Sequence, residues 1–288
     1  MIPANKFLSL LPDQVTPQAE EEFFTSLKLR NGTYKTTFQR RFSEINRELQ
    51  KLIGSGEIDV DHVLDIGISS GSNTVELYQE LNSAGHKSQV VGTDLMTEAY
   101  LVNVFPGCFA LVDDSGYPLR YDIGEWSIKP WVVASDYRNG FFLFRKCINL
   151  AFGYRARKMV SRTGSVVVRK VELVTPMLRK YTDVVVQQDD ITRYNRMFDG
   201  KFNLIRAANV LNKGYFTDAA LMEILENIRR YLAKPKAALL IVRTHANGTN
   251  HGTLFAVEEG EECKVIHRFG EGSEVEDIVL ECMRRKAS

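Results

Sequence analysis

The chain has 288 residues, of which 44% are hydrophobic and 25% charged, and its formal net charge at pH 7 is +1. These are the values of a globular protein with a substantial core, and they exclude a protein built wholly around nucleic acid. The four cysteines are far apart and lack a C-x-x-C, so we expect neither a metal site nor a disulfide framework. With no visible signal peptide or membrane-spanning apolar run, a cytoplasmic protein is expected.

Residues 1–57 are predicted to form a helical cap. The stretch TTFQRRFSEINRELQKLI places apolar residues at spacings of three and four, which is typical of an amphipathic helix. Gly54-Ser55-Gly56 is expected to end that helix. The apolar positions are Phe38, Phe42, Ile45, Leu49, Leu52 and Ile53.

Residues 58–288 are predicted to form one α/β domain in which strands and helices alternate. Five expected strands are DHVLDIG, SQVVGTDL, TDVVVQQDDI, KFNLIRAANVL and AALLIVRT, with helices SNTVELYQELNSAG and, capped by Thr217, TDAALMEILENIRRYLA. GTLFAVEEGEECKVIHRF is expected to add a two-stranded hairpin at the sheet edge. The expected fold is a Rossmann-like, mostly parallel seven-stranded sheet with helices on both faces.

The loop after the first strand, Gly67-Ile68-Ser69-Ser70-Gly71, allows two interpretations. It matches G-x-S-x-G, and Ser69, Asp190 and His245 occur in the order of a serine hydrolase triad. However, a nucleophile elbow follows earlier strands that supply an oxyanion loop, whereas this loop follows the first. A P-loop and a dinucleotide fingerprint are excluded, because the Gly-Lys-Ser/Thr and the glycines at 69 and 72 are missing. The hydrolase remains the alternative.

Polar residues at successive strand ends favour a cofactor site instead. Asp65 ends the first strand, Asp94 ends the second, and Asp190 and Asn209 follow the third and fourth. A carboxylate at the second strand end can accept both hydroxyls of a ribose, and one at the third can accept from an adenine amino group. Each residue also has a plainer interpretation, as a helix cap, a turn carboxylate or a loop hydrogen-bonder.

With these motifs in this order, the chain resembles class I S-adenosylmethionine-dependent methyltransferases, and FNLIRAANVLNKGYF is similar to the corresponding motif of chemotaxis receptor methyltransferases. The resemblance covers about residues 60–100 and 180–245. It implies S-adenosylmethionine as cofactor, with Asp65, Gly67, Ser69 and Gly71 around the methionine part, Asp94 at the ribose, Asp190 with Ile191 at the adenine, Asn209 with Val210 at the sulfonium, and Leu95 as a further cofactor-binding residue. Three positions depart from the family pattern: Ser69 replaces a glycine, Asn203 an aspartate, and Lys236 lies where a Pro-Gly-Gly turn is common.

The resemblance implies methyl transfer to a small-molecule or lipid-like acceptor, and we expect transfer to oxygen. Because the sulfonium carries its own leaving group, alignment supplies much of the rate. A base is needed only for a protonated acceptor; the candidates are Tyr215 and His245, and no other catalytic residue is identified. Since neither is compelling, a non-catalytic S-adenosylmethionine-binding sensor or scaffold is a further alternative.

A long insertion, at about residues 97–180, separates the second and third expected strands. FALVDDSGYPLRYDI predicts a hairpin that turns at 114–116, and Phe141, Phe144, Ile148 and Phe152 form one helical stripe. From Arg145 to Lys180 there are ten Lys or Arg against one acid. The stripe could pack on the core, receive the acceptor, or make peripheral membrane contact through residues 141–180. Nucleic acid is not an expected partner, since no RNA-binding module is recognisable.

Overall fold

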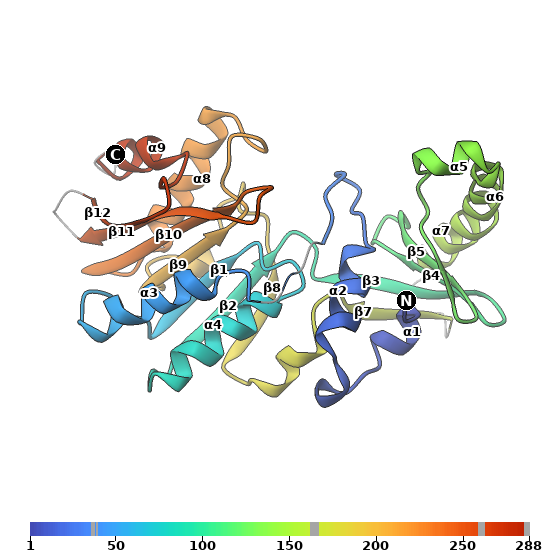
Figure 1. The fold of residues 1–288 in the computed structure, drawn as a ribbon, viewed down its shortest axis with the longest axis horizontal. Coiled ribbons are helices and arrows are strands. Elements are labelled where there is room, and N and C mark those ends of the chain that lie inside the picture. The colour runs from blue at the N-terminus through green and yellow to red at the C-terminus, as the bar shows by residue number, and fades with distance from the viewer. Residues whose placement is uncertain (36–37, 39, 162–166, 259–262, 285–288) are drawn as a thin grey trace. The chain divides into compact units, whose positions relative to one another are not determined.

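The computed structural model describes residues 1–35, 38, 40–161, 167–258 and 263–284. The chain forms two compact units (Figure 1). Unit 1 consists of Met1–Gln39 and Met96–Lys180, and unit 2 of Arg40–Leu95 and Tyr181–Ser288. The segment expected as an insertion and the first part of the expected cap therefore belong to the same unit, unit 1. The helix near residue 50, which was also expected in the cap, belongs to unit 2.

Unit 2 contains, in its described residues, a seven-stranded sheet of order β12-β11-β10-β9-β1-β2-β8. The ladders from β8 to β10 are parallel, and those of β11 with β10 and β12 are antiparallel. This confirms the α/β class and the edge hairpin, in a sheet that is mixed. The strands are β1 (His62–Ile66), β2 (Gln89–Asp94), β8 (Val184–Gln188), β9 (Leu204–Ala208), β10 (Lys236–Thr244), β11 (Asn250–Glu258) and β12 (Lys264–Phe269).

Helices cover both faces of this sheet (Figure 1). On one face α8 (Asp218–Tyr231) and α9 (Glu276–Arg284) pack on Leu64, Ile205 and Leu239 in one hydrophobic cluster. On the other face lie α3 (Ser43–Gly54) and α4 (Ser72–Ser83). The expected helix at 38–53 is shorter than predicted, since α3 begins at Ser43, and α9 was not among the expected elements. A short 3-10 turn, η4 (Arg196–Phe198), completes the unit.

Unit 1 is built around an antiparallel five-stranded sheet of order β6-β5-β4-β3-β7. Only its hairpin of β4 and β5 was predicted from the sequence, and that hairpin is confirmed. The strands are β3 (Glu98–Phe105), β4 (Cys108–Val112), β5 (Pro118–Ile123), β6 (Trp126–Ile128) and β7 (Val168–Glu172). The other elements are α1 (Ala4–Phe7), η1 (Pro12–Gln14), α2 (Pro17–Thr25), α5 (Ala134–Arg138), α6 (Phe141–Ile148), a π-helical turn η2 (Asn149–Gly153), α7 (Tyr154–Val160) and η3 (Pro176–Lys180).

Alternation along the strands of unit 1 supplies two separate cores. Leu101 of β3 and Leu111 of β4 pack with α1 and α2 on one face. Val102 and Val112, one residue further along each strand, pack with α6, η2 and α7 on the other. The sheet is thus covered by apolar contacts on both faces.

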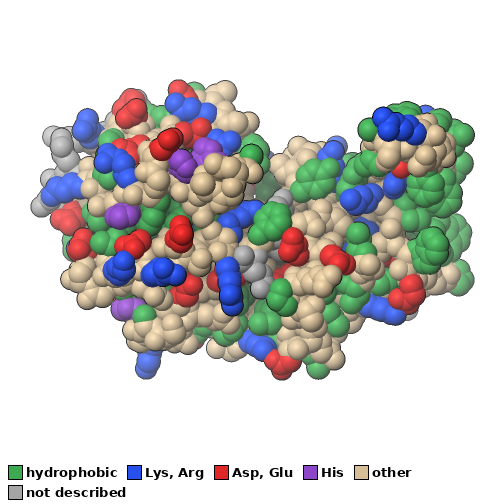
Figure 2. Space-filling model, in the orientation of Figure 1, with side chains coloured by type: hydrophobic (Ala, Val, Ile, Leu, Met, Phe, Trp, Pro, Cys, Tyr) green, Lys and Arg blue, Asp and Glu red, His purple; other side chains and the backbone are tan. Residues whose placement is uncertain are grey.

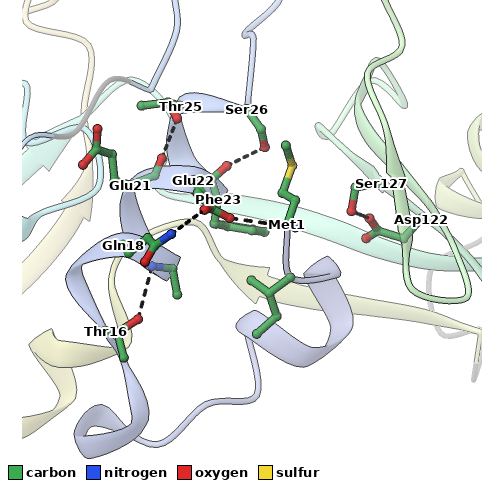
Figure 3. Close-up of polar contacts among 12 residues, drawn as sticks. Met1, Thr16, Gln18, Glu21, Glu22, Phe23, Thr25, Ser26, Asp122 and Ser127 are labelled. Atoms are coloured by element: carbon green, nitrogen blue, oxygen red, sulfur yellow. Dashed lines mark hydrogen bonds and ion pairs between the residues drawn. The ribbon is translucent and has the colours of Figure 1, made fainter.

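A buried ion pair anchors the N-terminus within unit 1. Arg120 Nε donates to Asp122 Oδ1 at 2.9 Å, and both residues are almost fully buried. Asp122 also accepts from the Ala4 amide at 2.7 Å and from the Ser127 hydroxyl at 2.6 Å. Figure 3 shows this Ser127–Asp122 bond beside the contacts of the first helices. The carboxylate therefore joins α1 to β5 and β6.

None of the described helices has the length and the apolar content that a membrane crossing needs.

The N-cap of α8 gives a direct test of a predicted feature. The Thr217 hydroxyl accepts from the Ala220 amide at 3.3 Å, as expected of a cap. Thr217→Ala is expected to lower the free energy of unfolding by about 1 kcal/mol, because that amide loses its acceptor. Thr217→Ser keeps the oxygen and should stay near wild type in urea denaturation. Equal losses in the two variants would contradict the cap.

Candidate functional site

The parallel strands of unit 2 all end at the same edge of the sheet, and the order of the strands reverses at β1. β1 lies between β2 and β9, so the chain turns to one side of β1 for β2 and to the other side for β9. Ligands of open α/β sheets bind outside the carboxyl ends of the strands at such a switch point. A ligand site is therefore expected at the loops after β1 and β9.

The loop after β1 has a left-handed backbone at alternate residues. The φ angles of Gly67, Ser69 and Gly71 are 74°, 56° and 83°. A side chain at position 67 would overlap Val210, which follows β9, so this position requires glycine for space as well as for conformation. The predicted residues Gly67 and Val210 are thus brought together across the switch point, and Gly71 caps α4.

Asp94 holds this loop against the end of β2. The Ser69 amide donates to Asp94 Oδ2 at 2.7 Å, and the Asp189 amide donates to the Asp94 carbonyl at 3.0 Å. Asp94 is half-buried, so its carboxylate lies at the rim of the strand ends. The ends of β1, β2 and β8 are therefore connected through one residue, and the predicted residues Ser69 and Asp94 are in direct contact.

A hollow of about 570 Å³ lies beside these strand ends. Of the predicted cofactor residues, Leu95 and Asp190 line it, and the Leu95 side chain is 53% exposed. The complete lining is Leu95, Gln188, Asp189, Asp190, Arg193, Tyr194, Asn195, Arg196 and Met197. Leu95 offers an apolar surface, and Asp189 and Asp190 offer hydrogen-bond acceptors. Together they suit a ligand with a flat ring that carries polar groups.

Asp189 is a candidate that the sequence interpretation missed. Its carboxylate accepts from Asn195 Nδ2 at 2.8 Å, and burial raises the pKa of Asp189, with the charge of Asp190 adding to the rise. Asp190 is already engaged in a local turn, because its Oδ1 accepts from both the amide and the hydroxyl of Thr192 at 3.1 and 2.7 Å. The signal was the pair of aspartates in QQDDI, of which the prediction took only the second.

Ile191 faces the core in the structure. Its side chain packs against the hydrophobic cluster of α8, and its carbonyl accepts from Asn227 Nδ2 at 3.3 Å. The residue is thus oriented by packing, and it supports the turn that carries Asp189 and Asp190.

Asp65 is part of a buried ion pair. Arg206 Nε donates to Asp65 Oδ1 at 2.8 Å and Arg206 Nη2 to Oδ2 at 2.6 Å, while the Thr74 hydroxyl donates to Oδ2 at 2.7 Å. Asp65 and Arg206 are each 2% exposed and lie opposite each other in the register of β1 and β9. We therefore assign Asp65 to holding these strands and α4 together, since its carboxylate is closed off from a ligand. Sequence reasoning missed Arg206.

Asn209 is the first residue of a series of hydrogen bonds that links neighbouring strand ends. Its φ is 62°, and its Oδ1 accepts from the Thr244 amide at 2.6 Å. The Thr244 hydroxyl donates to Asn250 Oδ1 at 2.8 Å, and Asn250 Nδ2 donates to the Arg41 carbonyl at 2.6 Å. This series of hydrogen bonds links the end of β9 to β10, β11 and the segment before α3. It also holds Asn209 in its left-handed conformation.

The two candidate bases lie in different surroundings. The Tyr215 side chain is 63% exposed, and its backbone amide donates to Asn212 Oδ1, which shapes the loop. The His245 ring lies 4.4 Å from the ring of His251 in the β10–β11 turn. Neither contact identifies a base.

The three members of the alternative triad have different partners in the structure. The Ser69 amide donates to Asp94, Asp190 accepts from Thr192, and the His245 ring packs against the His251 ring in a tilted arrangement. Among the residues that the structure describes, no group of three His, Cys, Asp or Glu side chains is arranged to hold a metal ion.

Comparisons with known proteins give low-identity structural likenesses. No protein-family model matches the chain, and no curated protein matches it. Solved structures similar to it include a Pyrococcus horikoshii protein, with 13% identity over 83% of this chain and 78% of that chain and a TM-score of 0.37. Another is the N-methyltransferase NodS from Bradyrhizobium japonicum in complex with S-adenosylhomocysteine, with 15% identity, 78% and 71% coverage and a TM-score of 0.35.

A third is the CMeT domain of the citrinin polyketide synthase, with 14% identity, 70% and 34% coverage and a TM-score of 0.34. This chain spans about a third of the length of that chain and of the CurJ carbon methyltransferase. The NodS and CurJ proteins are named as methyltransferases. At these scores they are a likeness only, and the function is inferred from the residues of unit 2.

The Asp65–Arg206 pair predicts a large stability effect. Arg206→Met leaves the Asp65 carboxylate buried without its partner and should lower the free energy of unfolding by roughly 3–5 kcal/mol. The double variant Asp65→Leu/Arg206→Met replaces both charges with apolar side chains and should recover most of that loss. Urea denaturation measures all three proteins. A double variant no more stable than Arg206→Met would contradict a pairwise structural role.

Proposed function

We propose that unit 2 binds S-adenosylmethionine and that the protein transfers its methyl group to a small-molecule or lipid-like acceptor, at an oxygen atom. The observation that carries this proposal is the geometry of the two loops at the switch point. There the left-handed loop 67–71, held by Asp94, meets Val210 after β9. In this proposal the Rossmann-like unit 2 is the methyltransferase part, and residues 97–180 contribute acceptor recognition, with peripheral membrane contact as an additional role.

The residues present fit the cofactor at most of the predicted positions. The loop of Gly67, Ser69 and Gly71 would receive the methionine part beside the N-terminus of α4. Asp94, whose carboxylate has several acceptor sites, would accept from the ribose while it holds Ser69. Leu95 and Asp189, with Asp190, would take the adenine in the hollow. Asp65 does not fit a direct contact, because it is closed off by Arg206.

The chemistry places modest demands on the chain itself. S-adenosylmethionine supplies an electrophilic methyl group whose leaving group is a neutral thioether. The residues of unit 2 would then bind and orient, and the fixed backbone at Asn209 and Val210 would define one wall beside the reacting atoms. A carboxylate acceptor requires no base, whereas a hydroxyl acceptor requires proton removal, for which Tyr215 and His245 remain the candidates.

Two alternatives make different predictions. A serine hydrolase using Ser69 would react with a fluorophosphonate probe at that residue, whereas the methyltransferase would not. A sensor or scaffold would bind S-adenosylmethionine but would show no turnover with any acceptor in a panel of carboxylates, phenols, alcohols and amines.

Calorimetry with S-adenosylmethionine and S-adenosylhomocysteine tests cofactor binding. We expect both to bind, and we expect Asp94→Ala to weaken binding by about 1.5–3 kcal/mol for a lost charged hydrogen bond, roughly 10-fold or more. Asp94→Asn keeps an acceptor for the Ser69 amide and separates loss of charge from loss of the loop. Asp59→Ala removes an exposed carboxylate before β1 and serves as the matched control. Absence of binding at millimolar ligand would overturn the proposal.

The raised pKa of Asp189 predicts a pH dependence. Burial favours the neutral form of this carboxyl, so it protonates at a higher pH than an ordinary aspartate. Cofactor affinity should fall as the pH is lowered through that pKa, because the protonated group is a weaker acceptor for the adenine amino group.

Asp189→Asn should bind more weakly at neutral pH and should lack this part of the pH dependence, since it does not titrate. Asp190→Asn, which keeps an acceptor for Thr192, should retain a pH dependence but shift it to lower pH, because the charge of Asp190 no longer adds to the raised pKa of Asp189. Calorimetry between neutral and mildly acidic pH measures both. An Asp189→Asn profile identical to wild type would remove Asp189 from the site.

A further inference from the structure

The helical arm of unit 1, residues 134–160 in α5, α6, η2 and α7, has one face that belongs to the core. Ile148, Phe152 and Ala156 recur every four residues, and all three are buried against the sheet. They pack with Val102 and Tyr121, among others. The expected stripe from Phe141 to Phe152 is thus buried only in its second half, since Phe141 and Phe144 are exposed.

The opposite face of the same arm is also apolar, and it is exposed. Leu143, Cys147, Leu150 and Tyr154 recur at spacings of four, three and four residues, which places them along one side of the helices. Leu143, Leu150 and Tyr154 are 58%, 76% and 68% exposed. A helix that is apolar on two faces has buried only one of them, and an exposed row of large apolar side chains marks an interaction surface.

The charges around this exposed stripe have one sign. Residues 134–160 contain six Lys or Arg and a single acid, Asp136. Asp136 is buried and accepts from Arg145 Nε at 2.7 Å, so its charge is already matched inside the arm. The remaining basic residues, Arg138, Lys146, Arg155, Arg157 and Lys158, are exposed. Figure 2 shows apolar and basic side chains together over this part of the molecule.

We propose that the arm docks on an anionic lipid surface, with the stripe of Leu143, Cys147, Leu150 and Tyr154 in the headgroup region and the basic residues on acidic headgroups. This combination of an apolar face and flanking cations is the one that binds in the plane of a membrane interface. A second copy of the chain fits less well, because two such arms would repel each other. Nucleic acid also fits less well, since Leu143, Cys147 and Leu150 offer no ring for base stacking and Tyr154 supplies a single ring at one end of the stripe.

Co-sedimentation of the 288-residue protein with vesicles tests this docking. Binding is expected with phosphatidylcholine vesicles that contain phosphatidylserine, and little with phosphatidylcholine alone; added salt should weaken it. Leu150→Asp should reduce binding roughly 10-fold through the lost apolar contact. Lys146→Glu/Lys158→Glu should reduce it by at least as much, since each reversal replaces an attraction by a repulsion.

Leu11→Asp is the matched control, because Leu11 is also an exposed leucine of unit 1 but lies outside the arm. It should bind as wild type, and circular dichroism should show that all variants are folded. Equal binding of wild type and Leu150→Asp would overturn the proposal. So would a lipid-free dimer that Leu150→Asp dissociates, or single-stranded RNA binding that needs the same residues without vesicle binding. The inference deepens the membrane role in the proposed function, and none of these readouts depends on S-adenosylmethionine, so they fail or succeed independently of cofactor binding and methyl transfer.

Discussion

The buried pair of Asp65 and Arg206 is the interaction on which the candidate site depends. It crosses from β1 to β9, the two strands on either side of the switch point, and the Thr74 hydroxyl adds α4 to the same carboxylate. The loop at 67–71 begins two residues after Asp65, and Val210 follows Arg206 by four. A change at this pair would therefore alter the spacing between the loops that follow β1 and β9. Because an unpartnered buried charge is costly, each member holds the other in place.

The strands of unit 2 could be predicted because parallel strands covered on both faces read as short continuous apolar runs. Most strands of the unit 1 sheet were not predicted, because they lack such continuous apolar runs or pair with distant parts of the sequence. β7 (Val168–Glu172) carries three charged residues in five, and β3 pairs with it across a long sequence separation. The partner of Asp65 was missed for a related reason. Arg206 is 141 residues away, and only the register of β1 with β9 makes the two neighbours.

At the site, backbone requirements were easier to predict than side-chain partners. Gly67 and Gly71 are glycines in left-handed positions, and their place in a loop after a strand is visible in the sequence. Which of Asp189 and Asp190 lies free of a local turn is decided by Thr192 and Asn195, whose hydrogen bonds depend on the folded loop. The same holds for Asn209, whose amide oxygen is used by Thr244 on the neighbouring strand.

Backbone strain at two of these positions indicates that the loops after β1 and β9 are held in their conformations by the protein itself. Among the described residues, the non-glycine residues with positive φ are Arg40, Ser69 and Asn209. Ser69 and Asn209 lie on the two sides of the switch point, and each is compensated by a hydrogen bond to a neighbouring strand end, Asp94 or Thr244. Such conformations persist only where the surrounding structure enforces them. A ligand that binds at these loops therefore meets a backbone already ordered, and its binding free energy is not reduced by ordering them.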